Sequence, residues 1–99
     1  EPQNATFLDT YAWVFDKRKE YTMAQLYIEM AIKNERRPSS DIYDHYGDIL
    51  LAVGNKQEAL KQWKKALELD AGNKELLEKV EKLALELQPV DTKENTDDK

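Results

Sequence analysis

The sequence predicts an all-α protein made of two antiparallel helical hairpins followed by one further helix. Three observations predict this architecture. Apolar residues recur every three or four positions along most of the chain, as they do on the buried face of a helix. Glycine and proline are scarce, with three of each among 99 residues. A shift of 35 residues places apolar residues on apolar ones and small residues on small ones, which indicates an internal repeat.

The first hairpin is expected over the first third of the chain. A helix from Ala5 to Lys17, capped by Asn4, is apolar around most of its circumference, which predicts neighbours on several sides. A second helix from Tyr21 to Glu35 carries its apolar residues on one face. Pro38 then blocks helix continuation, and Ser39 or Ser40 is expected to cap the next helix.

The second hairpin is predicted from Ser40 to Asp70, with its turn at Gly54-Asn55. Gly54 can adopt a positive φ and end the first of its helices. Asn55 can cap the second, with Glu58 three residues later as in a capping box. Because so few residues separate the two helices, they must fold back on each other.

A fifth helix is expected from Asn73 to Leu87. One face of this helix is charged, and on it Glu75-Lys79 and Glu78-Lys82 have the i, i+4 spacing of intrahelical ion pairs. One stripe is apolar, which predicts a capping helix that covers the second hairpin; a short coiled coil is the alternative. The stripe contains Leu76, Leu77, Val80, Leu83 and Leu87.

The repeat resembles the tetratricopeptide repeat, whose pattern is W-x2-L-G-x2-Y, A-x3-F and a closing Pro over about 34 residues. The second unit fills those positions with Tyr43, Tyr46, Gly47, Leu50, Ala59, Trp63 and Ala71. The first unit fills them with Leu8, Tyr11, Ala12, Phe15, Ala24, Ile28 and Arg36. Both closing prolines are missing, and the resemblance covers Ala5 to Gly72.

This resemblance implies a fragment of an α-α superhelix. The expected organisation is a remnant of a preceding repeat over 1–4, repeats over 5–38 and 39–72, a capping helix over 73–88 and a disordered acidic tail over 89–99. Small residues are expected where helices cross closely. The expected repeat-packing residues are Leu8, Tyr11, Ala12, Phe15, Ala24, Ile28, Ala31, Tyr43, Tyr46, Gly47, Leu50, Ala59, Trp63 and Ala66.

The function that the resemblance implies is a non-catalytic protein-interaction scaffold, here the C-terminal fragment of a longer array. In this family the first helix of each repeat lines a concave groove that holds a peptide. The groove residues would be Asp9, Trp13, Asp16, Asp41, Asp44, Asp48 and Leu51. Carboxylates beside a tryptophan suit a basic or amphipathic peptide rather than the acidic tails bound by chaperone-binding members. In the alternatives, the acids only keep the surface soluble, or the segment ends the array and ligands bind upstream.

Other chemistry has little support in the sequence. Asp41, His45 and Asp48 share a helix face and are a remote candidate for a metal site, but no second histidine or nucleophile accompanies them. We therefore expect no catalytic residue, no metal and no cofactor. The absence of cysteine excludes disulfides and thiolate ligands.

The composition of the chain limits the classes of partner that it is expected to bind. The net charge of −5 argues against nucleic acid, and Lys17-Arg18-Lys19 is better explained as a solvated helix end. No apolar run approaches the ~20 residues of a membrane span, so direct membrane insertion is not expected. The segments Asp9–Trp13 and His45–Asp48 resemble the last repeats of bacterial cell-envelope tetratricopeptide proteins. That resemblance implies the bacterial periplasm or cell envelope, with the cytoplasm as the alternative.

Self-association is a further expectation. Without a preceding repeat, the first helix should expose apolar area near Phe7, Leu8, Tyr11 and Val14. Exposed apolar patches of more than a few hundred Å² tend to be covered. A homodimer through this helix is therefore predicted.

Overall fold

A computed structural model describes residues 4–88, which form five α-helices and no strand. The predicted all-α architecture is confirmed. The predicted tail over 89–99, and the predicted repeat remnant apart from Asn4, lie outside the described residues. The helices are α1 (Ala5–Lys17), α2 (Tyr21–Asn34), α3 (Ser40–Ala52), α4 (Lys56–Leu69) and α5 (Lys74–Leu87).

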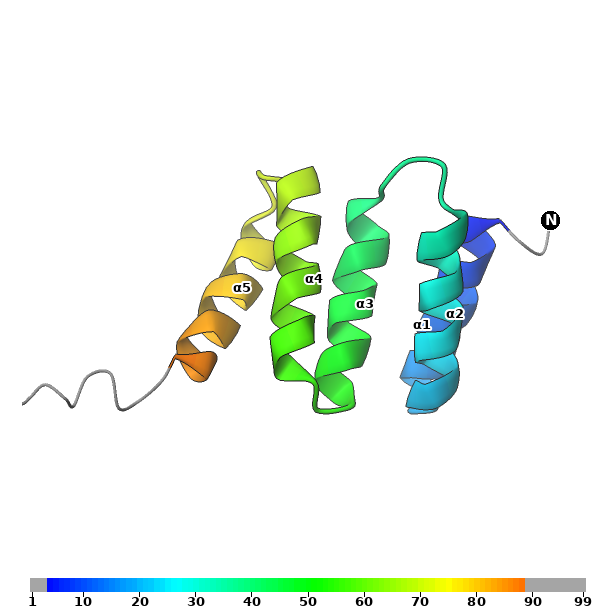
Figure 1. The fold of residues 1–99 in the computed structure, drawn as a ribbon, viewed down its shortest axis with the longest axis horizontal. Helices are drawn as coiled ribbons and strands as arrows, with labels where there is room; N and C mark the ends of the chain where they lie inside the picture. Colours follow the sequence, from blue (N-terminus) through cyan, green and yellow to red (C-terminus); the bar gives the residue numbers. More distant parts are fainter. Residues whose placement is uncertain (1–3, 89–99) are drawn as a thin grey trace, which may run out of the picture.

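The helices pack in chain order as two hairpins and a final helix (Figure 1). The most extensive contacts join α1 to α2 and α3 to α4, while α2 against α3 and α4 against α5 link the units. α1 also contacts α3, less extensively, and the side chain of Lys79 on α5 reaches Asp44 and Asp48 on α3. No helix within residues 4–88 combines the length and apolarity needed to cross a membrane.

Asparagine side chains cap the starts of three helices, and one glycine shapes the turn between α3 and α4. Asn4, Asn55 and Asn73 each accept a hydrogen bond from the amide three residues later, at 3.3, 3.3 and 3.0 Å. Gly54 ends the turn after α3 with φ = 91°, a conformation that glycine adopts without a Cβ penalty.

The start of α3 differs from the expectation. The side chain of Ser39 makes no cap; instead the Ser39 amide donates to Glu35 Oε1 at 3.2 Å. Ser40 Oγ donates to the carbonyl of Ala66 on α4, at 3.0 Å. The two serines therefore link α3 to neighbouring segments and their side chains do not cap it. The carboxylate of Glu35, just past the end of α2, accepts the hydrogen bond from the Ser39 amide instead.

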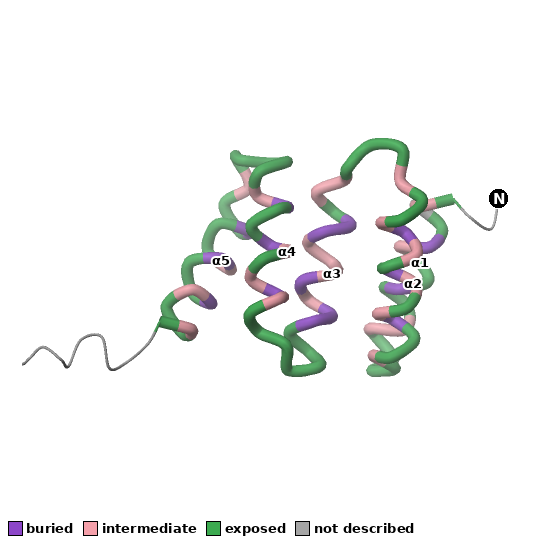
Figure 2. The backbone as a smooth tube through the Cα atoms, viewed as in Figure 1, coloured by how far each residue is buried: buried purple, intermediate pink, exposed green. Residues whose placement is uncertain are grey.

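The core consists of two apolar clusters that meet at α3. Ile42 and Ile49 join the first cluster, whereas Tyr43 and Leu50 join the second. Each pair is spaced i, i+7, so α3 has one buried face toward α2 and another toward α4. Figure 2 shows the resulting close succession of buried positions along α3. The other buried members are Leu8, Ala12, Ala24, Ile28 and Ala31 in the first cluster, and Ala59, Trp63, Ala66, Leu76, Val80 and Leu83 in the second.

The small residue at position 47 is explained by the tryptophan opposite it. A Cβ added to Gly47 would clash with the indole of Trp63. In the first repeat, Ile28 occupies the position equivalent to Trp63, and there Ala12 fits with no exposed area. The size of the residue on the first helix of each hairpin is thus matched to its partner on the second.

Most of the expected repeat-packing residues lie in these clusters, and Gly47 is buried beside Trp63. Tyr11 is half exposed, while Phe15 and Tyr46 are partly buried at the cluster edges. The expectation that Leu8 is exposed on α1 is wrong, because Leu8 retains only 2% of its surface. It points toward α2, into the first cluster.

Candidate functional site

The groove residues predicted from the sequence lie on α1 and α3, on a surface that side-chain bridges extend to α5. We call this surface the α1/α3/α5 face. It contains Asp9, Trp13 and Asp16 at i, i+4 and i+7 on α1, and it continues over α3 and α5. The remaining members are Asp41, Asp44, His45, Asp48, Leu51 and Lys79.

A bridge between α1 and α3 engages the first of the predicted acids. Asp9 Oδ1 lies 2.7 Å from Nδ1 of His45. This hydrogen bond raises the pKa of His45, and the charges of Asp9, Asp44 and Asp48 add to the effect, while burial opposes it. Protonated His45 thus offsets the charge of Asp9.

A second bridge, between α3 and α5, engages two more acids. Lys79 Nζ lies 2.6 Å from Asp44 Oδ1 and 2.8 Å from Asp48 Oδ1. It also lies 4.6 Å from the centroid of the Trp63 ring, and the indole Nε1 donates to the Asp44 carbonyl at 3.1 Å. The ammonium group is therefore held by two carboxylates and an aromatic face.

The pKa values of this cluster follow from burial and charge. Burial opposes the charge of Lys79, but its hydrogen bonds to Asp44 and Asp48, and their charges, together raise its pKa. Burial raises the pKa of Asp48, and Lys79 offsets only part of that effect. A single ammonium is thus shared by two acids, and burial makes Asp48 costly to ionise.

Sequence reasoning missed Lys79 as a member of this face. The expected ion pair Glu75-Lys79 is wrong, since Lys79 binds Asp44 and Asp48 on α3. Among the ion pairs of residues 4–88, Glu78-Lys82 is not present either. A signal was present: Lys79 borders the stripe of Leu76, Val80 and Leu83, all buried in the structure. A lysine beside a buried stripe has its head group close to the neighbouring helix.

Four of the predicted groove residues remain available to a ligand. Trp13 and Leu51 are 47% and 37% exposed. Lys17 Nζ lies over the Trp13 ring, 5.0 Å from the ring centroid. Among residues 4–88, no ion pair or side-chain hydrogen bond engages the carboxylates of Asp16 or Asp41.

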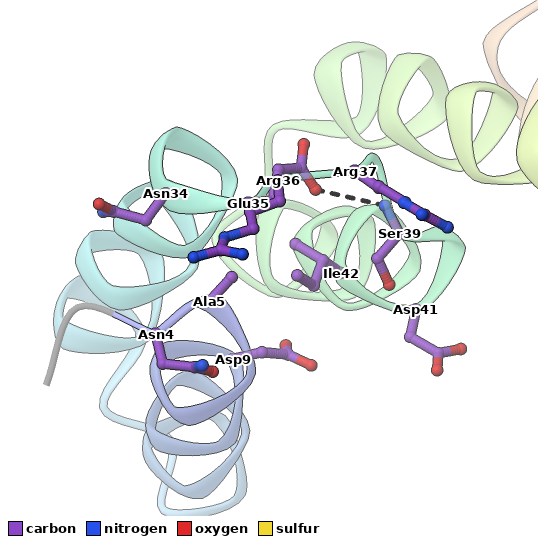
Figure 3. A pocket seen from close by; sticks show the side chains of 10 residues that line it. All are labelled: Asn4, Ala5, Asp9, Asn34, Glu35, Arg36, Arg37, Ser39, Asp41 and Ile42. Atoms are coloured by element: carbon purple, nitrogen blue, oxygen red, sulfur yellow. Dashed lines mark hydrogen bonds between the residues drawn. The ribbon is translucent and has the colours of Figure 1, made fainter. Parts of the chain in front are cut away.

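Two hollows lie beside this face. The larger, of about 840 Å³, is bounded by the starts of α1 and α3 and by the α2–α3 loop (Figure 3). Its lining is mostly polar and includes Asp9 and Asp41 as well as Arg36 and Arg37.

The smaller hollow, of about 360 Å³, lies between the end of α3, the start of α4 and α5. Its lining includes Leu51, Trp63 and Leu83, with Lys56 and Lys82 among the charged residues. The first hollow is thus polar and of mixed charge, and the second is more apolar with lysines at its edge.

The geometry gives no support to the remote metal alternative. Within the described part of the chain, no three His, Cys, Asp or Glu side chains are arranged to hold a metal ion. His45 directs Nδ1 to Asp9 instead of sharing a site with Asp41 and Asp48.

Comparison with known proteins identifies the fold. No family model and no curated protein matches the sequence. Among solved structures, the chain is similar to the first tetratricopeptide-repeat domain of Spaghetti (RPAP3) bound to the HSP90 peptide SRMEEVD. The TM-score is 0.81 at 22% sequence identity, over 90% of this chain and 70% of that one. The bacterial envelope origin suggested by the sequence stays a prediction.

Proposed function

Because this chain has the fold of a tetratricopeptide-repeat domain, we propose that it is a non-catalytic interaction domain that binds a peptide or protein segment on its α1/α3/α5 face. The observation that carries the proposal is the exposure of Trp13 and Leu51 on α1 and α3, two helices that contact each other and that the Lys79 bridge links to α5. Exposed aromatic and aliphatic side chains beside polar ones are typical of peptide-binding surfaces. The similar structure, which holds a peptide, supports the same class of ligand.

The charge of the face favours a segment with basic residues. Asp16 and Asp41 keep carboxylates without an ion-pair partner within residues 4–88, and the chain has a net charge of −5. The peptide SRMEEVD in the similar structure has three acidic residues, so we expect this chain to have the opposite charge preference. Asp9, Asp44 and Asp48 contribute less than the sequence suggested, because His45 and Lys79 already bind their carboxylates.

A purely structural role is the second candidate. The placement of Lys79 between Asp44 and Asp48 supports it, because two acids of the predicted groove then serve to attach α5. In that case the segment ends a repeat array and recognition takes place elsewhere.

Fluorescence titration with designed peptides separates the two candidates. Trp13 is half exposed whereas Trp63 is buried, so a ligand near Trp13 changes the emission of one tryptophan. Three 12-residue peptides, each with one leucine and with a net charge of +4, 0 or −4, serve as probes. We expect the basic peptide to bind, and Asp16→Asn with Asp41→Asn to weaken it about tenfold, or about 1.4 kcal/mol.

The matched control removes two negative charges away from the face. Glu68 and Glu81 are exposed on α4 and α5, so Glu68→Gln with Glu81→Gln should leave binding within about twofold. Equal losses in both double variants would show a general effect of net charge instead of a site. Absence of binding by all three peptides would favour the structural role.

A further inference from the structure

The smaller hollow beside the α1/α3/α5 face is built around two buried side chains. Trp63 of α4 and Leu83 of α5 line it, and each retains only 4% of its surface. Leu51 of α3, which belongs to the face and is more exposed, lines it as well. Its volume of about 360 Å³ lies at the lower end of the range for ligand pockets, roughly 300–1,000 Å³, so one side chain of a bound peptide can occupy it.

Most polar groups that line this hollow are already engaged by the protein itself. The indole Nε1 of Trp63 donates to the carbonyl of Asp44. Lys79 Nζ binds two carboxylates of α3, and Lys56 Nζ lies 3.3 Å from Oε1 of Glu86. An occupant therefore meets few free hydrogen-bonding groups, and it gains free energy mainly by removing apolar surface from water.

The lysines of the hollow decide which side chains of a basic segment can enter it. Lys82 has no ion-pair partner within residues 4–88, and Lys56 shares one only with the exposed Glu86. These ammonium groups repel a lysine or an arginine of the ligand. Basic residues that bind near Asp16 and Asp41 are thus kept out of the hollow, and an apolar residue of the same segment is left to fill it.

The two repeats differ at this place on the face. A shift of 35 residues places Leu51 on Asp16 and Trp63 on Ile28. Among residues 4–88, no ion pair engages Asp16. The first repeat therefore offers a carboxylate where the second offers an apolar side chain beside a hollow.

We infer that the smaller hollow holds one aliphatic side chain of the bound segment, of about the size of leucine. This inference rests on the proposed function, which places a basic segment on the same face. Because the acidic and the apolar positions belong to different repeats, a ligand must present a basic residue and an aliphatic residue at a fixed spacing. The hollow thus makes the face selective for the sequence of the ligand as well as for its charge.

A leucine scan of the basic peptide tests this inference. The 12-residue peptide of net charge +4 has its lysines grouped at one end, serine elsewhere, and one leucine placed at each serine position in turn. Isothermal titration calorimetry measures the Kd of each peptide and of the form without leucine. We expect leucine to lower the Kd about tenfold at one or two neighbouring positions and to change it little at the others.

A double-mutant cycle then assigns this gain to the hollow. Leu51→Ser should remove the gain from leucine, yet leave the Kd of the peptide without leucine within about twofold, because the contact needs both partners. Leu26→Ser is the matched control, since Leu26 is exposed on α2, outside the face. It should leave the gain intact.

The outcomes separate this inference from the proposed function. Equal binding at every leucine position, or a gain that survives Leu51→Ser, would overturn the inference while the proposed function stands. A gain that Leu26→Ser removes equally would do the same, because the leucine would then act outside the hollow. If no basic peptide binds, the proposed function fails and the inference fails with it.

Discussion

At the residue scale, the pair of His45 and Asp9 connects the two hairpins through a titratable group. Its pKa is raised in the folded protein, mainly by the hydrogen bond to Asp9 and also by the charges of Asp44 and Asp48. A group with a raised pKa stabilises the fold fully below its unfolded value, near 6.5 for histidine, and loses this contribution as the pH rises through the folded value. The bridge should therefore be strongest in mildly acidic solution.

We predict that His45→Gln lowers the free energy of unfolding by roughly 1 kcal/mol at pH 5.5, and by less as the pH rises above 7. Urea unfolding of both proteins between pH 5 and 9 measures the difference. Asp9→Asn should remove most of this pH dependence, because it takes away the largest cause of the raised pKa. A difference between the proteins that stays constant across this range would contradict the assignment.

At the scale of elements, α5 is attached by charge as well as by apolar contacts. Leu76, Val80 and Leu83 pack against α4, while Lys79 binds α3. The ammonium lies between two acids and offsets their mutual repulsion, and Asp48 is already costly to ionise because of burial. Loss of Lys79 therefore leaves charges that the fold does not compensate.

We predict that Lys79→Met destabilises the protein by about 1 kcal/mol, since solvent reaches part of the cluster, and lowers amide protection in α5 before other helices. Lys82→Met is the matched control, because it removes one charge from an exposed position of the same helix. Hydrogen exchange measured by mass spectrometry resolves the helices. Equal effects of both substitutions would show that the binding of α3 by Lys79 contributes nothing specific.

At the scale of the whole molecule, α3 links the two apolar clusters. It contributes Ile42 and Ile49 to one cluster and Tyr43 and Leu50 to the other, so each cluster is incomplete without it. α1 takes part in the first cluster alone. Stacked repeats are stabilised by such interfaces between neighbours, so the position of a helix in the stack decides how far its loss is felt.

We predict that Ile49→Ala and Leu8→Ala, which alter similarly buried side chains, each lower the free energy of unfolding by about 2–5 kcal/mol. The two substitutions should differ in how many helices lose amide protection. Ile49→Ala should lower amide protection in both hairpins and α5, whereas Leu8→Ala should lower it mainly in α1 and α2. Native-state hydrogen exchange distinguishes the two patterns. If both variants lose protection only in the first hairpin, α3 does not couple the clusters.

By itself the sequence determined the five helices, their order and the two hairpins. Local signals suffice for this, because apolar spacing, asparagine caps and the turn at Gly54 act within a few residues. The internal repeat also shows the same apolar spacing in both hairpins. The observed ends of α2 and α5 differ from the expected ones by a single residue. The positions of Asp44 and Asp48 on one face of α3 also followed from their i, i+4 spacing.

Only the tertiary structure decided which of the predicted acids form ion pairs. The bridges from His45 to Asp9 and from Lys79 to Asp44 and Asp48 join residues 36, 35 and 31 positions apart. Whether such groups meet depends on the distance and rotation between helices, which no local pattern specifies. For the same reason the sequence misplaced Leu8 and paired Lys79 with Glu75: spacing shows which residues share a helix face, but packing decides what that face touches.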